Sequence, residues 1–383
     1  MDFVDLKTQQ KRIKATLDTN IQRVLEHGKY IMGPEIKELE TKLGAYVGAK
    51  HAISCASGTD ALLMALMALN VGPGDAVFTT PFTFIATAEV ISLLGATPVF
   101  VDIDQKTYNI DPEKLEKAII AVKSNNASIH CLPLINKNLN PKCIIPVDLF
   151  GLPADYDVID AVAKKNNLVV IEDAAQSFGA EYNARKACSF GNIGCTSFFP
   201  AKPLGCYGDG GMCFTDDDTL ASVLRSTRVH GQGSHKYENI RIGINGRLDT
   251  LQAAILLAKF EIFPEEIELR QQIAENYTSL ISHNSAITTQ SIPTGGKSAW
   301  AQYSILAKDE SKRAAFIDKL KAANIPTAIY YPTPLHRQTA FAGLGYKPGD
   351  FPVSEDCASR IFSLPMHPYL LKEDQEKIAA LFA

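Results

Sequence analysis

The sequence predicts an α/β protein in which a large domain, built on a mostly parallel central sheet flanked by helices, precedes a smaller α+β domain. In the first half of the chain, short runs of β-branched and apolar residues alternate with segments of helical periodicity. Strands that are apolar throughout are typical of a parallel sheet covered on both faces. With 383 residues, 46% of them hydrophobic, the chain is long enough for two domains.

The expected elements follow in chain order. Strands are expected at 76–81, 97–103, 143–150 and 168–174, with helices between them at 86–94, 111–122 and 156–166. A long helix over 262–282 precedes a composition break near 285–298. Strand-like runs at 301–307 and 326–332 then enclose a helix at 310–323. We therefore expect a large domain over 1–250 and a small domain over 251–383, an order that lets the N-terminal segment pack on the small domain.

Residues 123–142 fit neither the strand nor the helix pattern. They are rich in Asn, Lys and Pro, which is typical of a surface loop. We interpret them as a surface insertion, either inert or in contact with a ligand.

The composition argues against a nucleic-acid or membrane partner. The 38 basic and 42 acidic residues give a net charge of −4, with no basic run. The N-terminus has no apolar signal core, and the longest apolar stretch, Ala61–Val71, is far shorter than the roughly 20 residues that span a membrane. The eight cysteines form no CxxC pair and no zinc pattern, which indicates reduced thiols in a cytoplasmic protein without a metal site.

Three segments carry residues suited to chemistry. Ser57, Gly58 and Thr59 precede a strongly apolar helix, and the free N–H groups of a helix start can hold a phosphate. Asp173 ends an apolar strand, where ligands of open α/β sheets gather, and Gln176 follows it. Taken alone, Ser57 fits an ordinary helix cap, and Asp173 fits a capping residue in a strand–helix turn.

Lys202 lies between two prolines, in an apolar and aromatic segment before a Gly-rich turn. Burial lowers the pKa of a lysine below its usual value of about 10.4 and so favours the neutral amine that forms an imine. Most lysines are solvated surface charges, but the Pro-Ala-Lys-Pro setting argues against that reading here. Lys202 is therefore a candidate for imine formation.

The order of these segments, a helix start, then Asp173, then Lys202, resembles that of the DegT/StrS nucleotide-sugar aminotransferases, which are fold type I pyridoxal-phosphate (PLP) enzymes. The resemblance covers essentially the whole chain. It rests on these motifs: GKYIMGPEIKELE (28–40), SGTDAL, PFTFIATAE (81–89), VDLFG (147–151), EDAAQSFGA, SFFPAKPLGCYGDGG, GINGRLDTLQAA (243–254) and YYPTPLH (330–336).

The resemblance implies a cofactor role for several residues. Lys202 matches the lysine that holds PLP as a Schiff base and moves the proton, and Asp173 matches the partner of the pyridine nitrogen. Gln176 matches the residue beside the phenolic oxygen. Phe84 matches the aromatic residue that stacks on the ring, although it also fits an ordinary core position.

The cofactor phosphate is expected to lie between two subunits. Gly58, Thr59 and Ser197 match the cradle that holds this phosphate. Asn245 matches a residue that reaches the phosphate from the other subunit. The resemblance therefore implies a homodimer with shared active sites.

The resemblance also implies the reaction. Related sugar dehydrases carry His at the position of Lys202, so the lysine favours amino transfer, a reaction of the EC 2.6.1 class. Glutamate would give its amino group to a nucleotide-linked keto sugar and leave as 2-oxoglutarate. The motifs FVDLKTQQKRI (3–13) and SLPMHPYL (363–370) are most similar to members acting on UDP-2-acetamido-2-deoxy-3-oxo-glucuronate, which make a 2,3-diamino uronic acid for lipopolysaccharide O-antigen and similar surface polysaccharides.

Such a substrate carries a carboxylate and a pyrophosphate, which cationic groups should face. Arg247 and Tyr331 are the residues that we expect there, although an Arg is common at this position and also fits an interface ion pair. Tyr330 stands where the compared enzymes often have His, which leaves the sugar open. One alternative is a dTDP-linked 3-keto or 4-keto deoxyhexose. Another is a PLP-binding regulator without turnover, although regulators of this fold add a helix-turn-helix domain for which the segment before residue 28 has no room.

Overall fold

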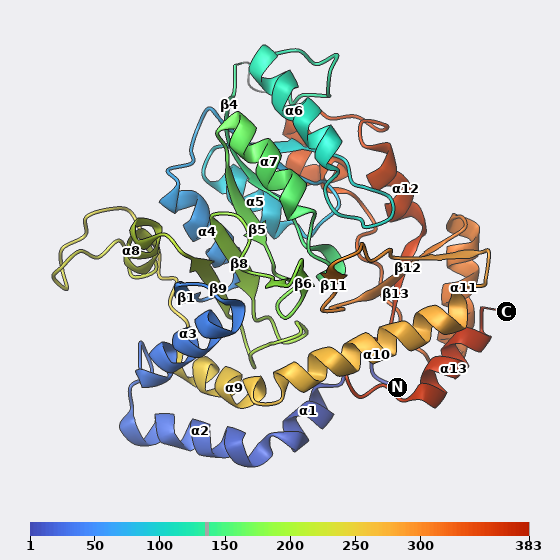
Figure 1. The fold of residues 1–383 in the computed structure, drawn as a ribbon, viewed down its shortest axis with the longest axis horizontal. Coiled ribbons are helices and arrows are strands. Elements are labelled where there is room, and N and C mark those ends of the chain that lie inside the picture. Colours follow the sequence, from blue (N-terminus) through green and yellow to red (C-terminus); the bar gives the residue numbers. More distant parts are fainter. Residues whose placement is uncertain (135–137, 383) are drawn as a thin grey trace.

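The computed structural model describes residues 1–134 and 138–382, and a seven-stranded sheet lies at its centre (Figure 1). The strand order is β1-β9-β8-β5-β4-β2-β3, and only β9 runs antiparallel to its neighbours. The predicted mostly parallel sheet is confirmed. The strands are β1 (His51–Cys55), β2 (Asp75–Thr79), β3 (Thr97–Phe100), β4 (Asn140–Ile145), β5 (Val169–Asp173), β8 (Ile193–Ser197) and β9 (Gly211–Thr215).

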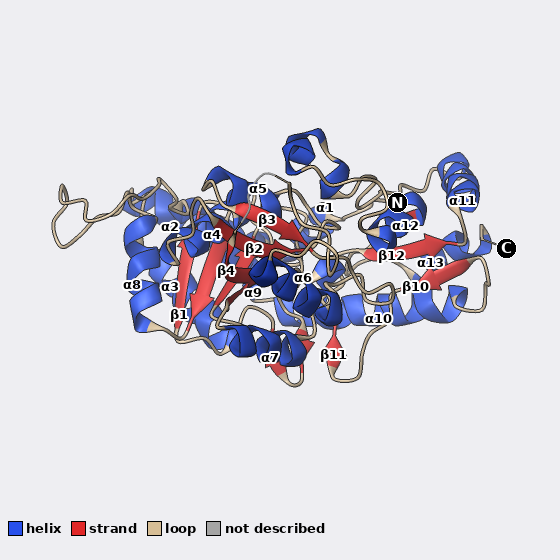
Figure 2. Cartoon of the chain, turned by 90° about the horizontal axis from the view of Figure 1, so that it is seen from above, coloured by secondary structure: helices blue, strands red, loops and turns tan. Residues whose placement is uncertain are grey.

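Helices cover both faces of this sheet (Figure 2). Alternate residues of the strands supply the two cores: Val77 and Ile145 pack toward α4 (Gly58–Ala68), whereas Phe78 and Ile144 pack toward α6 (Pro112–Ser124). The first face carries α4 (Gly58–Ala68), α5 (Ala86–Leu93) and α8 (Asp218–Thr227). The other face carries α3 (Pro34–Val47), α6 (Pro112–Ser124), α7 (Tyr156–Asn166) and α9 (Thr250–Phe260).

A second, antiparallel sheet follows toward the C-terminus. Its order is β10-β12-β13, and the long helix α10 runs from beneath the large sheet to this small one (Figure 1). These elements are α10 (Phe263–Ile281), β10 (Ile287–Thr289), β12 (Tyr303–Ala307), α11 (Glu310–Ala322), α12 (Pro352–Arg360), β13 (Ile361–Leu364) and α13 (Lys372–Ala380). Two-residue strands β6 (Glu181–Tyr182), β7 (Arg185–Lys186) and β11 (Gly296–Lys297) form a third small sheet.

Two N-terminal helices, α1 (Leu6–Arg12) and α2 (Lys14–His27), lie along α9 and α10. The α2 residue Leu17 packs with Ile255 of α9. On α1, the Gln9 amide donates to the Glu266 carboxylate of α10 at 2.8 Å in a buried position. The start of the chain is therefore fixed to the helix that leads to the small sheet.

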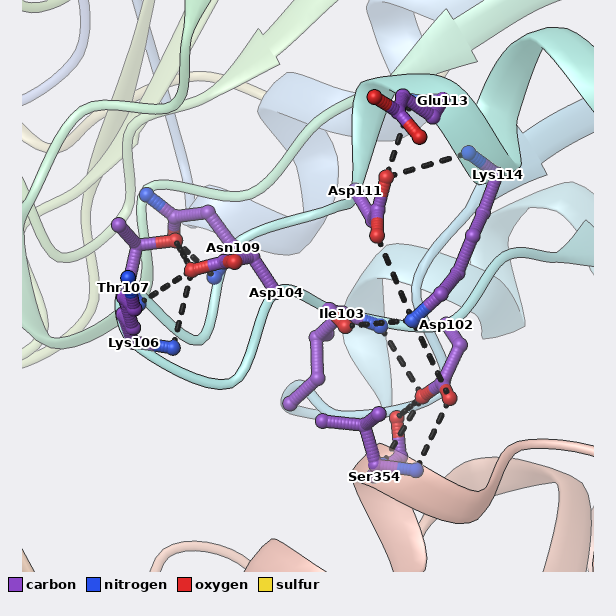
Figure 3. A network of polar contacts seen from close by, with 11 residues as sticks. Asp102, Ile103, Asp104, Lys106, Thr107, Asn109, Asp111, Glu113, Lys114 and Ser354 are labelled. Carbon is purple, nitrogen blue, oxygen red and sulfur yellow. Dashed lines mark hydrogen bonds and ion pairs between the residues drawn. The ribbon is translucent and has the colours of Figure 1, made fainter.

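A buried carboxylate ties the two sheets together. Asp102, just after β3, accepts hydrogen bonds from the backbone N–H groups of Val353 and Ser354 and from the Ser354 hydroxyl at 3.0, 2.9 and 2.6 Å (Figure 3). Lys114 lies 3.7 Å from the same carboxylate. Asp102 therefore satisfies N–H groups at the start of α12 that no helix bond can reach.

Two expectations need correction. Within the described part of the chain, residues 326–332 form no strand, and their only ladder contact there is the single bridge between Ala328 and Ser363. The predicted insertion at 123–142 is too wide, because α6 continues through Ser124 and β4 begins at Asn140. Between these ends, residues 125–129 are exposed, as a surface loop requires, whereas residues 135–137 lie outside the described part of the chain.

The apolar stretch Ala61–Val71 forms most of α4 and packs in the core. Among the helices of the described residues, none is both long and apolar enough to cross a membrane.

Candidate active site

The predicted site residues gather at one edge of the large sheet. Asp173 ends β5, Ser197 ends β8, and Ser57 follows the end of β1. The antiparallel strand β9 begins at the same edge, where Gly211 pairs with both Cys55 and Ser197. Carboxyl ends of parallel strands meet at one edge, so segments far apart in the sequence become neighbours.

Lys202 reaches this edge because the loop after β8 folds back on itself. The Phe198 amide donates to Gly210 at 2.7 Å, and the Lys202 amide donates to Phe199 at 2.9 Å. The Lys202 side chain is partly buried, and within the described residues its amine has no hydrogen bond or ion pair. Burial lowers the pKa of Lys202 to about 8, against the opposing effect of the Asp173 charge. About a tenth of the amine is therefore neutral near pH 7.

Asp173 is 4% exposed and is held in place by two donors. The Thr87 hydroxyl donates to one carboxylate oxygen at 2.7 Å, and the Ala175 amide donates to the other at 3.2 Å. Burial raises the pKa of Asp173, whereas these bonds and the nearby Lys202 charge lower it. The carboxylate has no ion pair within the described residues and so keeps capacity for a cationic donor.

Gln176 and Tyr331 are joined across the site. The Gln176 amide donates to the Tyr331 hydroxyl at 3.2 Å, while its carbonyl oxygen accepts from the Phe150 amide at 2.7 Å. Phe150 has φ 62°, a strained conformation for a residue with a side chain. The hydrogen bond that its amide donates to Gln176 helps to hold this conformation. Burial raises the pKa of Tyr331 far above neutrality, so its hydroxyl stays protonated.

Two aromatic side chains line the approach to these groups. Phe84 is 54% exposed, with its ring centroid 6.4 Å from that of Tyr331. The exposure argues against the ordinary core position that the sequence also allowed. Tyr330 is half-buried, with its ring 5.8 Å from that of Tyr331. Both predicted contacts therefore lie beside the Gln176–Tyr331 pair.

The predicted phosphate cradle is close-packed. A Cβ atom added to Gly58 would lie 2.6 Å from the Cβ of Ser197, so only glycine lets the start of α4 meet the end of β8. The Ser57 hydroxyl accepts from the Asp60 amide at 3.0 Å, which confirms the helix cap. Thr59 lies next in the first turn of α4 and is partly buried. The cap and the cradle therefore occupy the same helix start.

Asn245 and Arg247 lie on the segment beside this helix start. The Ala56 amide donates to Gly246 of the same chain at 3.0 Å, and Asn245 is exposed. The Nε atom of Arg247 is buried and has no hydrogen-bond partner in the described part of the chain. No ion pair within those residues involves Arg247, so its charge is available to an external anion.

Two further buried groups escaped the sequence reasoning. Thr87 lies in PFTFIATAE, a motif in which only Phe84 was predicted as a site residue. A single hydroxyl on an apolar helix matches no sequence pattern for a functional site. Asp148, in VDLFG, accepts from Ser177 and Tyr156, both at 2.7 Å, and burial raises its pKa to about 7. The Asp148 amide donates to the carbonyl of Asp173 at 3.1 Å, so Asp148 helps to hold the backbone of Asp173 in place.

The sequence profile of the DegT/DnrJ/EryC1/StrS aminotransferase family matches residues 11–383. The chain belongs to this family. The expected membership is thus confirmed over nearly the whole length, and with it the enzyme class of sugar aminotransferases.

Two relatives show the range of names within the family. A Pseudomonas aeruginosa protein named UDP-2-acetamido-2-deoxy-3-oxo-D-glucuronate aminotransferase is 52% identical to this aminotransferase, over 97% of this chain and 96% of the relative. A Geobacillus stearothermophilus protein named pleiotropic regulatory protein is 43% identical, over 99% of this chain and 98% of the relative.

Solved structures agree with the fold. An aminotransferase of the family from Brucella abortus has a TM-score of 0.93 at 50% identity, over 100% of this chain and 98% of its own. DesV of S. venezuelae, in complex with a ketimine intermediate, has a TM-score of 0.90 at 33% identity, over 99% and 96% of the two chains. A Bacillus subtilis protein with bound cofactor PMP has a TM-score of 0.86 at 27% identity, over 99% and 82%.

Proposed function

We propose that this protein is a PLP-dependent aminotransferase that moves an amino group from glutamate to UDP-2-acetamido-2-deoxy-3-oxo-glucuronate. The observation that carries the proposal is Lys202, with its pKa lowered to about 8, beside the buried carboxylate of Asp173. The sequence identity of 52% to the P. aeruginosa relative supports this sugar over other keto sugars. The product would be a 2,3-diamino uronic acid for lipopolysaccharide or a similar surface polysaccharide.

The residues present fit PLP. Because Gly58 has no side chain, the start of α4 lies against Ser197, and the N–H groups of that helix start together with the Ser197 hydroxyl suit a phosphate. Asp173 is a buried carboxylate without a cationic partner in the described part of the chain, which suits a protonated ring nitrogen. Bound PLP supplies an aldehyde that takes up the amino group and a ring that accepts an electron pair.

The side chains then have separate tasks. Lys202 would hold the cofactor; once the amino donor has taken its place, the freed Lys202 amine would move a proton from the substrate carbon as general base and return it as general acid. Asp173, fixed by Thr87, would keep the proton on the ring nitrogen. Gln176 would lie beside the phenolic oxygen, and Phe84 would pack on the ring.

Substrate binding falls to the cationic and aromatic groups around this centre. Arg247, with a buried Nε atom lacking a partner in the described residues, binds an anionic group of the substrate. Tyr330 and Tyr331 contact the sugar, with Tyr331 positioned by Gln176.

We further propose that two chains form a cytoplasmic homodimer, in which Asn245 of one subunit reaches the cofactor phosphate of the other. Gly58, Thr59 and Ser197 supply the rest of that phosphate site. The division into a large domain at 1–250 and a small domain at 251–383 belongs to the same proposal. Apolar side chains are exposed before α3 and after α8, among them Tyr30, Ile31 and Ile242. They support a partner subunit that covers these two segments.

A substrate screen tests the proposal. Purified protein with PLP and glutamate is supplied separately with the UDP-linked 3-oxo uronate and with dTDP-linked 3-keto and 4-keto hexoses, and amino-sugar formation is measured by mass spectrometry. We expect rapid turnover of the UDP-linked uronate. Turnover restricted to the dTDP-linked sugars would contradict the proposed UDP-linked substrate. Failure to exchange label between glutamate and 2-oxoglutarate would contradict the proposed aminotransferase activity and favour a regulator without turnover.

A further inference from the structure

The two terminal motifs, 3–13 and 363–370, take no part in the chemistry proposed above, yet they pack on one another. The Met366 amide donates to the carbonyl of Phe3 at 3.1 Å, and the guanidinium of Arg12 lies 5.6 Å from the ring centre of Tyr369. The Asp5 side chain accepts from the Thr8 amide at 2.9 Å and so fixes the turn into α1.

Helix α1 is also fastened to α10, so the position of Phe3 is set from two sides. Gln9 bonds to Glu266 in a buried position at 2.8 Å, and Arg12 pairs with Glu265 at 2.7 Å. The Tyr369 hydroxyl donates to the same Glu266 carboxylate. These contacts leave residues 3–5 little freedom relative to the small sheet.

Phe3 begins a chain of aromatic rings that leads into the site. Its ring centroid lies 6.4 Å from that of Tyr330, with the ring planes at 57°. Tyr330 is 5.8 Å from Tyr331, and Tyr331 is 6.4 Å from Phe84. Within the described residues the Tyr330 hydroxyl has no hydrogen-bond partner, so it is available to a ligand. Tilted aromatic pairs at such distances restrict one another's orientation.

We propose that Phe3 is a positioning residue for substrate specificity. It packs on the outer side of Tyr330 and holds that ring, with its free hydroxyl, against the sugar of the nucleotide-sugar substrate. The inference rests on the proposed function, because it takes Tyr330 as a sugar contact. One terminal motif supplies Phe3, and the other supplies the Met366 amide that donates to the carbonyl of Phe3.

The test compares the two half-reactions of the purified full-length enzyme with bound PLP. If Tyr330 contacts the sugar, as proposed, Phe3→Ala should leave the glutamate half-reaction unchanged. The same variant should raise KM for the keto sugar nucleotide roughly five- to tenfold, a loss typical of one apolar contact in a binding pocket. Phe3→Tyr, which keeps the ring, should restore KM. Leu371→Ala, which shortens an exposed apolar side chain next to the second terminal motif, is the control and should change neither parameter.

The double variant separates positioning from a general loss of structure. If Phe3 acts through Tyr330, adding Phe3→Ala to Tyr330→Ala should change KM no further. An unchanged KM in Phe3→Ala, additive effects in the double variant, or equal slowing of both half-reactions would each overturn the inference. Phe3→Leu replaces Phe3→Ala if the latter unfolds. The wild-type enzyme is first assayed on UDP-linked and dTDP-linked keto sugars, so failure on both would remove the proposed function before Phe3 is tested.

Discussion

At the scale of single residues, the charge of Lys202 decides what the site can do at neutral pH. Burial removes water from the ammonium group and favours the free amine, while the carboxylate of Asp173 favours the charged form. The pKa of about 8 is the balance of these effects, with burial the stronger. A lysine in water would be almost wholly charged at the same pH.

This balance predicts a pH profile for the cofactor-free protein. Only the neutral amine condenses with an aldehyde, so the rate of PLP uptake should rise about tenfold per pH unit below the pKa and level off above it. The midpoint should lie near 8. Because the Asp173 charge raises the pKa of Lys202, Asp173→Asn should move the midpoint to lower pH, whereas Glu373→Gln on α13 should not. Stopped-flow absorbance measures the uptake, and a midpoint above 10 would contradict the prediction.

Thr87 supports Asp173 through a single hydroxyl, which Thr87→Val removes without changing the shape of the side chain. Leaving a buried carboxylate oxygen unpaired should cost about 1–3 kcal/mol of unfolding free energy, measured in urea. The same bond lowers the pKa of Asp173, so its loss raises that pKa and weakens cofactor retention more at pH 6 than at pH 8. Thr87→Ser keeps the hydroxyl and should behave as wild type; equal loss in both variants would assign the effect to packing.

At the scale of elements, the start of α12 depends on the strand end of the other sheet (Figure 3). Asp102→Ala leaves two backbone N–H groups and the Ser354 hydroxyl without their acceptor, which should lower the free energy of unfolding by about 1–3 kcal/mol. We expect faster hydrogen exchange at 352–360, measured by mass spectrometry. Asp111→Ala removes the cap of α6 and should lower the free energy of unfolding by about 1 kcal/mol. It should leave hydrogen exchange at 352–360 unchanged. Unchanged exchange in Asp102→Ala would show that α12 is anchored elsewhere.

The elements also show where a local pattern is sufficient. Helices α6 and α7 are capped by Asp111 and Asp155, whose side chains accept amides of the first turn, and the predicted helices lie close to the observed ones. Residues 326–332 have the composition of a strand but form none, because a strand needs a neighbouring ladder. Pro326 and Pro332 lack the N–H groups that such a ladder uses, and only Ala328 finds a partner.

At the scale of the whole molecule, Asn245 tests the proposed dimer. Its segment bonds to Ala56 of its own chain, and mixing two inactive variants distinguishes a role in its own site from a role in the partner's. Lys202→Ala and Asn245→Ala proteins are unfolded, mixed and refolded together. If Asn245 acts across the interface, each mixed dimer has one intact site, and activity should recover to about a quarter of wild type. If it acts within one chain, both sites stay defective and the mixture stays as inactive as either variant refolded alone.

The sequence alone determined the α/β class, the order of the large-sheet elements between residues 76 and 174, and the residue types of the site. These depend on local periodicity, helix caps and motif order, all of which are written along the chain. The structure decided that β9 runs against its neighbours and that Asp173, Ser197 and Ser57 share one sheet edge. It also decided the partners of the site: Thr87 beneath Asp173, Gln176 beside Tyr331, and Phe3 against Tyr330. Such contacts join residues up to 327 positions apart, and no local pattern encodes them, because they exist only once the sheets and helices have packed.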